Sequence, residues 1–149
     1  MEKWNIKSLL FSILSIGVFM SFTQQDPLIA SLEKKFKTQI NKDIQRIYFI
    51  DETNISCLNC VTEFENYINN LPTTSYNLVL INNINNIINR SSKINKENCV
   101  LIYDKKKQKL NDLNMGIVYL HNGKVDSIIN IMPINIQSAL ERDFIIYKK

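Results

Sequence analysis

Short apolar stretches of strand length alternate along this chain with longer segments in which apolar residues recur every three or four positions. That alternation restricts the fold more than any other feature, because it predicts helices packed on a central sheet. We expect strands over residues 46–50, 76–81, 99–103, 116–120 and 125–131. The last two should form a hairpin, since Asn122-Gly123 between them is the dipeptide most favoured in a two-residue turn.

Several segments have helical periodicity. Asp26 followed by Pro27 has the pattern of an N-cap and a first helical residue, and we expect an amphipathic helix from there to about Lys42. Further helices are predicted over residues 57–71, 84–91 and 133–144. The apolar face of the last is expected to comprise Ile136, Leu140 and Phe144. Strands and helices in this order imply a three-layer α/β sandwich with a mixed central sheet flanked by helices.

Residues 1–25 have a different layout. Lys3 and Lys7 precede an uncharged, mostly apolar stretch over residues 8–22, and polar residues follow it, which is the order of a secretory signal. The stretch is shorter than the roughly 20 apolar residues that a spanning helix needs, which favours a cleaved signal peptide. No A-x-A-like cleavage site is evident, so a signal anchor that holds the chain at the membrane through residues 8–22 stays an alternative.

In either case the positive-inside rule keeps Lys3 and Lys7 in the cytoplasm and exports the remainder. Residues 26–149 are then predicted to be one extracytoplasmic or periplasmic domain, with its core over about residues 46–144 and the amphipathic helix before it.

Composition excludes several classes of function. The formal net charge of +4 comes from 18 basic and 14 acidic residues that are scattered without a basic stripe, so we expect no nucleic-acid partner. A single His cannot supply a Ser-His-Asp arrangement with matching partners, and three Gly leave no Gly-rich phosphate loop. We predict no cofactor.

Cys57 and Cys60 are the candidate redox site of the chain, because they stand at i and i+3 at the start of a predicted helix. Thiols at that spacing can form a disulfide, and a helix N-terminus favours a thiolate at the first position. A fixed structural disulfide is the alternative. Closing so short a loop removes little entropy from the unfolded chain, which favours redox chemistry over stabilisation.

A structural zinc site is not expected, since it needs four ligands and only Cys99 and His121 remain beside the cysteine pair. Cys99 begins an apolar strand and is interpreted as a small buried residue, with pairing between chains as the alternative. His121 opens the hairpin turn and is interpreted as a surface residue.

The order of strand, Cys57-Leu58-Asn59-Cys60, helix and closing hairpin resembles the thioredoxin family, in particular its exported or membrane-anchored thiol-disulfide oxidoreductases, from about Arg46 to Phe144. The resemblance implies a thioredoxin-like fold that exchanges with protein or small-molecule thiols and disulfides. Cys57 would attack and Cys60 would resolve the mixed disulfide. Asp51, six residues ahead of Cys57, matches the family's buried acid and becomes a candidate proton acceptor for Cys60, unless it caps local backbone amides.

The chain departs from the family at two places. Ser56 stands where a Trp usually precedes the first cysteine, and Met115, beside Gly116, occupies the slot of a cis-proline that holds the substrate backbone. Met115 and Gly116 are therefore the candidate substrate-binding positions. The departure also supports an alternative function, a binding or accessory protein of the same fold whose cysteines form a structural or residual disulfide.

Overall fold

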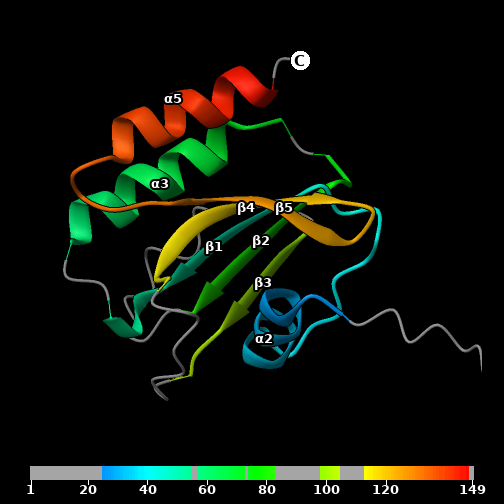
Figure 1. Ribbon diagram of the computed structural model, residues 1–149. Coiled ribbons are helices and arrows are strands. Elements are labelled where there is room, and N and C mark those ends of the chain that lie inside the picture. The colour runs from blue at the N-terminus through cyan, green and yellow to red at the C-terminus, as the bar shows by residue number, and fades with distance from the viewer. Residues whose placement is uncertain (1–24, 55–56, 73, 83–97, 105–112, 148–149) are drawn as a thin grey trace, which may run out of the picture.

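The computed structural model describes residues 25–54, 57–72, 74–82, 98–104 and 113–147. Its centre is a five-stranded mixed sheet in the order β3-β2-β1-β4-β5 (Figure 1). The strands are β1 (Arg46–Asp51), β2 (Asn77–Asn82), β3 (Cys99–Ile102), β4 (Met115–His121) and β5 (Lys124–Asn130). Strands β1, β2 and β3 run parallel, whereas β4 is antiparallel to β1 and β5 is antiparallel to β4. The predicted α/β class with a mixed sheet is confirmed.

Helices lie on both faces of the sheet. α3 (Leu58–Asn70) and α5 (Ile136–Tyr147) cover one face, and α2 (Pro27–Phe36) covers the other (Figure 1). A short 3-10 turn, η1 (Glu52–Asn54), follows β1. The expected helix over residues 84–91 and the N-terminal segment 1–24 lie outside the described residues. Within the described ranges, no helix combines the length and apolar character needed to cross a bilayer.

The helix α2 begins as predicted and ends earlier. The Asp26 carboxylate accepts a hydrogen bond from the backbone N–H of Leu28 at 2.9 Å, which caps the first turn. The helix stops at Phe36 because Lys37 adopts the left-handed conformation, with φ 50°. The predicted continuation to Lys42 is therefore wrong.

Two apolar layers hold the domain together, one on each face of the sheet. Successive side chains of a strand point to opposite faces, so Tyr48 and Ile50 pack under α3 and α5, whereas Ile47 and Phe49 pack against α2. Both sets are fully buried. This alternation decides on which side of the sheet each side chain near the cysteines lies.

The predicted hairpin between β4 and β5 is confirmed. Asn122 and Gly123 both have positive φ, 52° and 74°, as a type I′ turn requires. Near the start of β4, a Cβ at Gly116 would lie 2.6 Å from the carbonyl oxygen of Ile129 and 3.0 Å from the ring of Phe49. Gly116 thus allows β5 and Phe49 to approach the backbone of β4 closely.

The face that α5 buries differs from the prediction. Phe144 was expected on the apolar face, but it is 47% exposed. The buried positions are Ile136, Ala139, Leu140 and Asp143, which follow the i, i+3, i+4, i+7 spacing of one helical face. A carboxylate therefore occupies the interior position next to Phe144.

Candidate functional site

The cysteine pair lies at the N-terminus of α3, directly after β1 and η1. Cys57 is the N-cap of the helix, and its Sγ accepts a hydrogen bond from the backbone N–H of Cys60 at 3.3 Å. The two residues form a disulfide with a Cα–Cα distance of 5.4 Å. Because Cys57 has extended backbone angles and Cys60 lies in the first helical turn, the start of α3 brings the two sulfurs together.

The two sulfurs have unequal environments. Cys60 is 6% exposed and belongs to the core between the sheet, α3 and α5, whereas Cys57 is half-buried at the edge of that core. Leu58, between them, is 52% exposed. Cys57 is thus the more exposed residue of the pair, in agreement with the predicted attacking role.

Asp51 is buried at the end of β1 and has several partners. Its carboxylate forms an ion pair with the Lys35 ammonium, whose side chain is also buried. It accepts hydrogen bonds from the backbone N–H and the hydroxyl of Thr53, at 3.3 and 2.9 Å, and from the side-chain amide of Asn82 at 2.9 Å. Asp51 therefore combines both sequence interpretations, a buried acid and a cap of a local backbone amide.

The side of the sheet on which Asp51 lies bears on its predicted role. Lys35 belongs to α2, and Asp51 follows Phe49 on the α2 side by strand alternation. Cys60, in contrast, packs in the core on the α3 side. A proton moving between Asp51 and Cys60 would have to pass around the end of β1, so the described contacts give no direct path between them.

Asn82 extends this polar network across the ends of the parallel strands. Its side chain donates to the carbonyl oxygen of Asp104 and accepts from the N–H of Asp104, both at 2.9 Å, while it also donates to Asp51. Neither Lys35 nor Asn82 is among the site residues predicted from the sequence. A signal was present for Lys35, since it stands on the helical face that buries Leu28 and Leu32.

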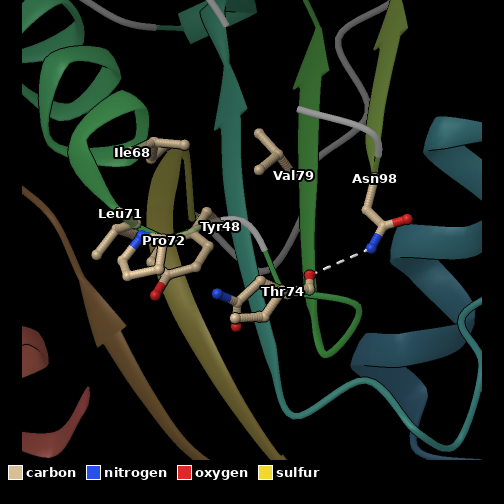
Figure 2. A pocket seen from close by; sticks show the side chains of 8 residues that line it. Tyr48, Ile68, Leu71, Pro72, Thr74, Val79 and Asn98 are labelled. Carbon is tan, nitrogen blue, oxygen red and sulfur yellow. Dashed lines mark hydrogen bonds between the residues drawn. The ribbon is translucent and has the colours of Figure 1, made fainter. Parts of the chain in front are cut away.

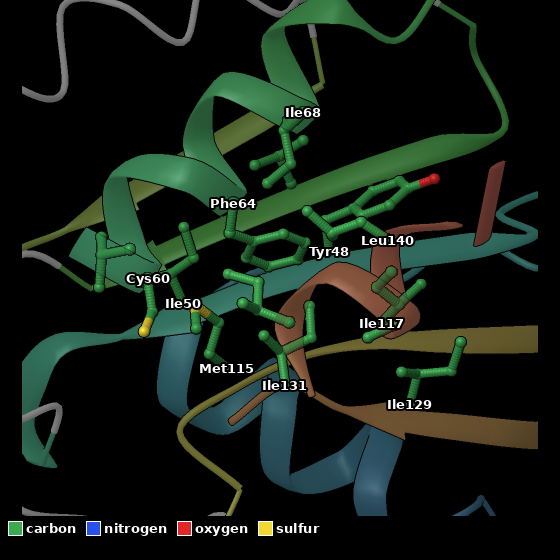
Figure 3. Close-up of a cluster of buried hydrophobic side chains, with 14 of the residues drawn as sticks. Tyr48, Ile50, Cys60, Phe64, Ile68, Met115, Ile117, Ile129, Ile131 and Leu140 are labelled. Atoms are coloured by element: carbon green, nitrogen blue, oxygen red, sulfur yellow. The ribbon is translucent and has the colours of Figure 1, made fainter. Parts of the chain in front are cut away.

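Met115 and Gly116 occupy interior positions. Met115 is 3% exposed and packs in the same core as Cys60, and Figure 3 shows its side chain between Cys60 and Ile131. The carbonyl oxygen of Met115 accepts the N–H of Ile131 at 2.9 Å. Neither predicted substrate-binding residue presents a side chain at the surface. No peptide bond of the described residues is cis.

Cys99 and His121 do not join the pair. Cys99 is half-buried in β3, and burial raises the pKa of its thiol to about 11, so that it is a neutral thiol at pH 7. His121 is exposed at the end of β4. Among the described residues, no three His, Cys, Asp or Glu side chains form a group that suits a metal ion.

A second buried cluster, which we call the Asp143 cluster, was not anticipated from the sequence. The Asp143 carboxylate accepts hydrogen bonds from the hydroxyls of Tyr48 at 3.0 Å, Tyr67 at 2.7 Å and Tyr119. The Arg46 Nε lies 3.8 Å from the same carboxylate. Burial, the charge of Asp143 and the hydrogen bonds to it all raise the pKa of the tyrosines. The cluster joins α5 to β1, β4 and α3.

An apolar cavity lies beside the C-terminal end of α3 (Figure 2). Its volume is about 20 Å³, which is room for about one water molecule. Its lining includes Tyr48, Ile68 and Val79, and the Asn98 side chain donates to the carbonyl oxygen of Thr74 at 3.3 Å at its edge. This cavity is too small for a substrate.

Comparison of the chain with protein-family models, with curated proteins and with solved structures finds no match.

Proposed function

We propose that this protein is a thiol-disulfide oxidoreductase with a thioredoxin-like fold that acts outside the cytoplasm. The observation that carries the proposal is the asymmetric disulfide at the start of α3, with Cys57 reachable at the helix N-terminus and Cys60 buried behind it. An enzyme that exchanges thiols in sequence needs this asymmetry, because one sulfur must meet the substrate and the other must stay within reach of the first.

The arrangement of the elements supports the finer description of the fold. β1, α3 and β2 form a parallel unit, the β4–β5 hairpin pairs with β1 on its other side, and α5 packs beside α3. This is the order that a thioredoxin-like domain would have around its cysteines. β3 is a departure, since it follows β2 along the chain and extends the sheet on that edge.

The proposed reaction exchanges a disulfide for a dithiol. In the oxidising direction, a substrate thiolate attacks Cys57 Sγ, the Cys57–Cys60 bond breaks, and its electron pair passes to Cys60 Sγ. A second substrate thiolate then attacks the substrate sulfur of the mixed disulfide and expels Cys57 as a thiolate. The N-terminus of α3 stabilises that thiolate through its helix dipole. The substrate class is therefore protein or small-molecule thiols and disulfides.

The same chemistry supports a location outside the cytoplasm. Disulfides persist in oxidising compartments, and the layout of residues 1–25 is that of a secretory signal or signal anchor. We place the domain in the periplasm or another extracytoplasmic space of the cell envelope, with contact to the membrane through residues 8–22 if the anchor is retained. Detection of the N-terminal residue of the exported protein by mass spectrometry distinguishes cleavage from anchoring.

Trapping of partners tests the proposed activity. In a Cys60→Ser variant Cys57 can still attack a substrate disulfide, but no Cys60 thiol remains to resolve the mixed disulfide, so we expect covalent adducts that a reductant releases. The matched control is Cys57→Ser, which should trap nothing at this site. Reduced Cys57 should also be alkylated at a lower pH than Cys99, whose pKa is about 11. Absence of adducts on Cys57, or a disulfide that stays closed in strong reducing buffer, would contradict an oxidoreductase.

Two observations favour a second candidate, a binding or accessory protein of the same fold. Asp51 forms an ion pair with Lys35 on the face of the sheet opposite Cys60, and the side chain of Met115 is too buried to contact a substrate. For this candidate, replacing both Cys57 and Cys60 by Ser should leave partner binding unchanged in cell extracts. Loss of binding in that double variant, together with trapped adducts in Cys60→Ser, would exclude it.

A further inference from the structure

The environment of Cys60 sets the direction from which the disulfide can be attacked. A thiolate must approach a disulfide sulfur along the line of the S–S bond, from the side opposite the sulfur that leaves. Attack on Cys60 would therefore require an open approach to Cys60 Sγ from the core. The exposed fraction of Cys60 is 6%, and it packs within the apolar cluster that contains Ile50 and Phe64.

Met115 packs in the same apolar cluster as Cys60. It is the first residue of β4, directly across from Ile50 on β1, and its side chain lies between Cys60 and Ile131 in Figure 3. The Ile131 N–H donates a hydrogen bond to the Met115 carbonyl oxygen at 2.9 Å, which holds the start of β4 beside the residue that follows β5. A methionine side chain is unbranched and polarisable, so it can fill the space against a sulfur closely.

We infer that Met115 is a positioning residue of the exchange site. Its side chain covers the Cys60 sulfur, so that external thiols can attack only the Cys57 sulfur. This inference rests on the proposed oxidoreductase function. When an external thiolate attacks Cys57 Sγ, the S–S electron pair passes to Cys60 Sγ, which takes up a proton. A second external thiolate then attacks the external sulfur of the mixed disulfide and expels Cys57 as a thiolate, so the external thiols end as a disulfide and Cys57 and Cys60 end as a dithiol.

The first measurement is alkylation of Cys60 by iodoacetamide in a Cys57→Ser background. Met115→Ala should raise the alkylation rate of Cys60 by at least about tenfold, because a covered thiol becomes open to solvent. Met115→Leu is the matched control that keeps the side-chain volume, and it should stay at the rate of the parent. Met115→Val is a milder variant for the case in which the Ala variant does not fold.

Cys99 provides an internal reference in the same molecules, because it lies on β3 and makes no part of the disulfide. If Met115 covers Cys60 locally, the alkylation rate of Cys99 stays unchanged in every variant. An equal increase at Cys60 and Cys99 would indicate general loosening of the fold and would overturn the inference. Equal Cys60 rates in the Ala, Val and Leu variants would overturn it as well.

The second measurement treats the oxidised chain, with both cysteines present, with reduced glutathione, and locates the adduct by peptide mass spectrometry after acid quenching. The wild-type protein should carry glutathione on Cys57 alone, whereas the Met115→Ala protein should carry it on both cysteines. Adducts on Cys60 in the wild type would refute the covering role. If glutathione attaches to neither cysteine in any variant, the proposed function fails, while the alkylation rates still decide by themselves whether Met115 covers Cys60.

Discussion

Replacement of Asp143 by Ala should destabilise the protein more than any other single change on α5. The substitution removes the acceptor of the Tyr48, Tyr67 and Tyr119 hydroxyls and the charge 3.8 Å from Arg46 Nε. It leaves phenols in the interior without their acceptor, and unsatisfied buried polar groups are costly.

The magnitude follows from how deeply each partner is buried. A hydrogen bond to a charged group contributes about 1.5–3 kcal/mol, so the buried Tyr48 and Tyr119 together contribute about 3–6 kcal/mol. Tyr67 is half-buried and can turn toward water, so its loss adds little. Arg46 is partly exposed and its attraction to Asp143 is screened. Because such contributions are not additive, we expect a total of about 3–5 kcal/mol.

The assay is urea unfolding of the full chain followed by circular dichroism at 222 nm, with the free energy of unfolding extrapolated to water. Phe144→Ala is the matched control on the neighbouring residue. Phe144 is 47% exposed, so its truncation should cost only about 1 kcal/mol. If Phe144→Ala destabilises the protein more than Asp143→Ala, the assignment of the buried face of α5 and the reasoning about the Asp143 cluster are both refuted.

The remaining predictions concern other buried contacts. The raised pKa of Tyr67 and Tyr119 means that the unfolded chain ionises first, so the free energy of unfolding should fall as pH rises above about 10; a Tyr119→Phe variant with an equal slope would contradict this. Lys35→Met should cost about 3–5 kcal/mol by leaving Asp51 buried without its ion-pair partner, and pairing it with Asp51→Leu should recover stability in a double-mutant cycle. Gly116→Ala should lower the thermal midpoint, because its Cβ would lie 2.6 Å from a backbone oxygen of β5; an unchanged midpoint would show that β5 shifts freely.

Patterns of neighbouring residues are sufficient to predict much of the architecture. The strands, the Asn122-Gly123 turn and the capped start of α2 depend on residues close together in the chain, and each was predicted within a few positions. The placement of Cys57 at the N-terminus of a helix is local in the same sense. Hydrophobic spacing and turn chemistry act over a few residues, and a sequence displays both directly.

Burial of polar side chains depends on contacts between distant segments. Asp143 and Phe144 are neighbours, and helical spacing favours the apolar one for the core; the hydroxyls of Tyr48, Tyr67 and Tyr119, which come from three other elements, reverse that choice. Those three hydroxyl partners are distant from Asp143 in the sequence, so a rule that considers only neighbouring residues cannot predict them.

Asp51 shows the same division at the candidate site. Its position six residues before Cys57 is visible in the sequence, but the side of the sheet on which it lies depends on the register of β1 and on Lys35 from α2. A strand turns successive side chains to opposite faces, so a shift of one position moves a carboxylate from one core to the other. The position of the cysteine pair at the start of a helix, after a buried strand, is predictable from nearby residues alone. That Met115 packs in the same core as Cys60, and that Asp51 faces α2, depends on segments that meet only when the sheet forms.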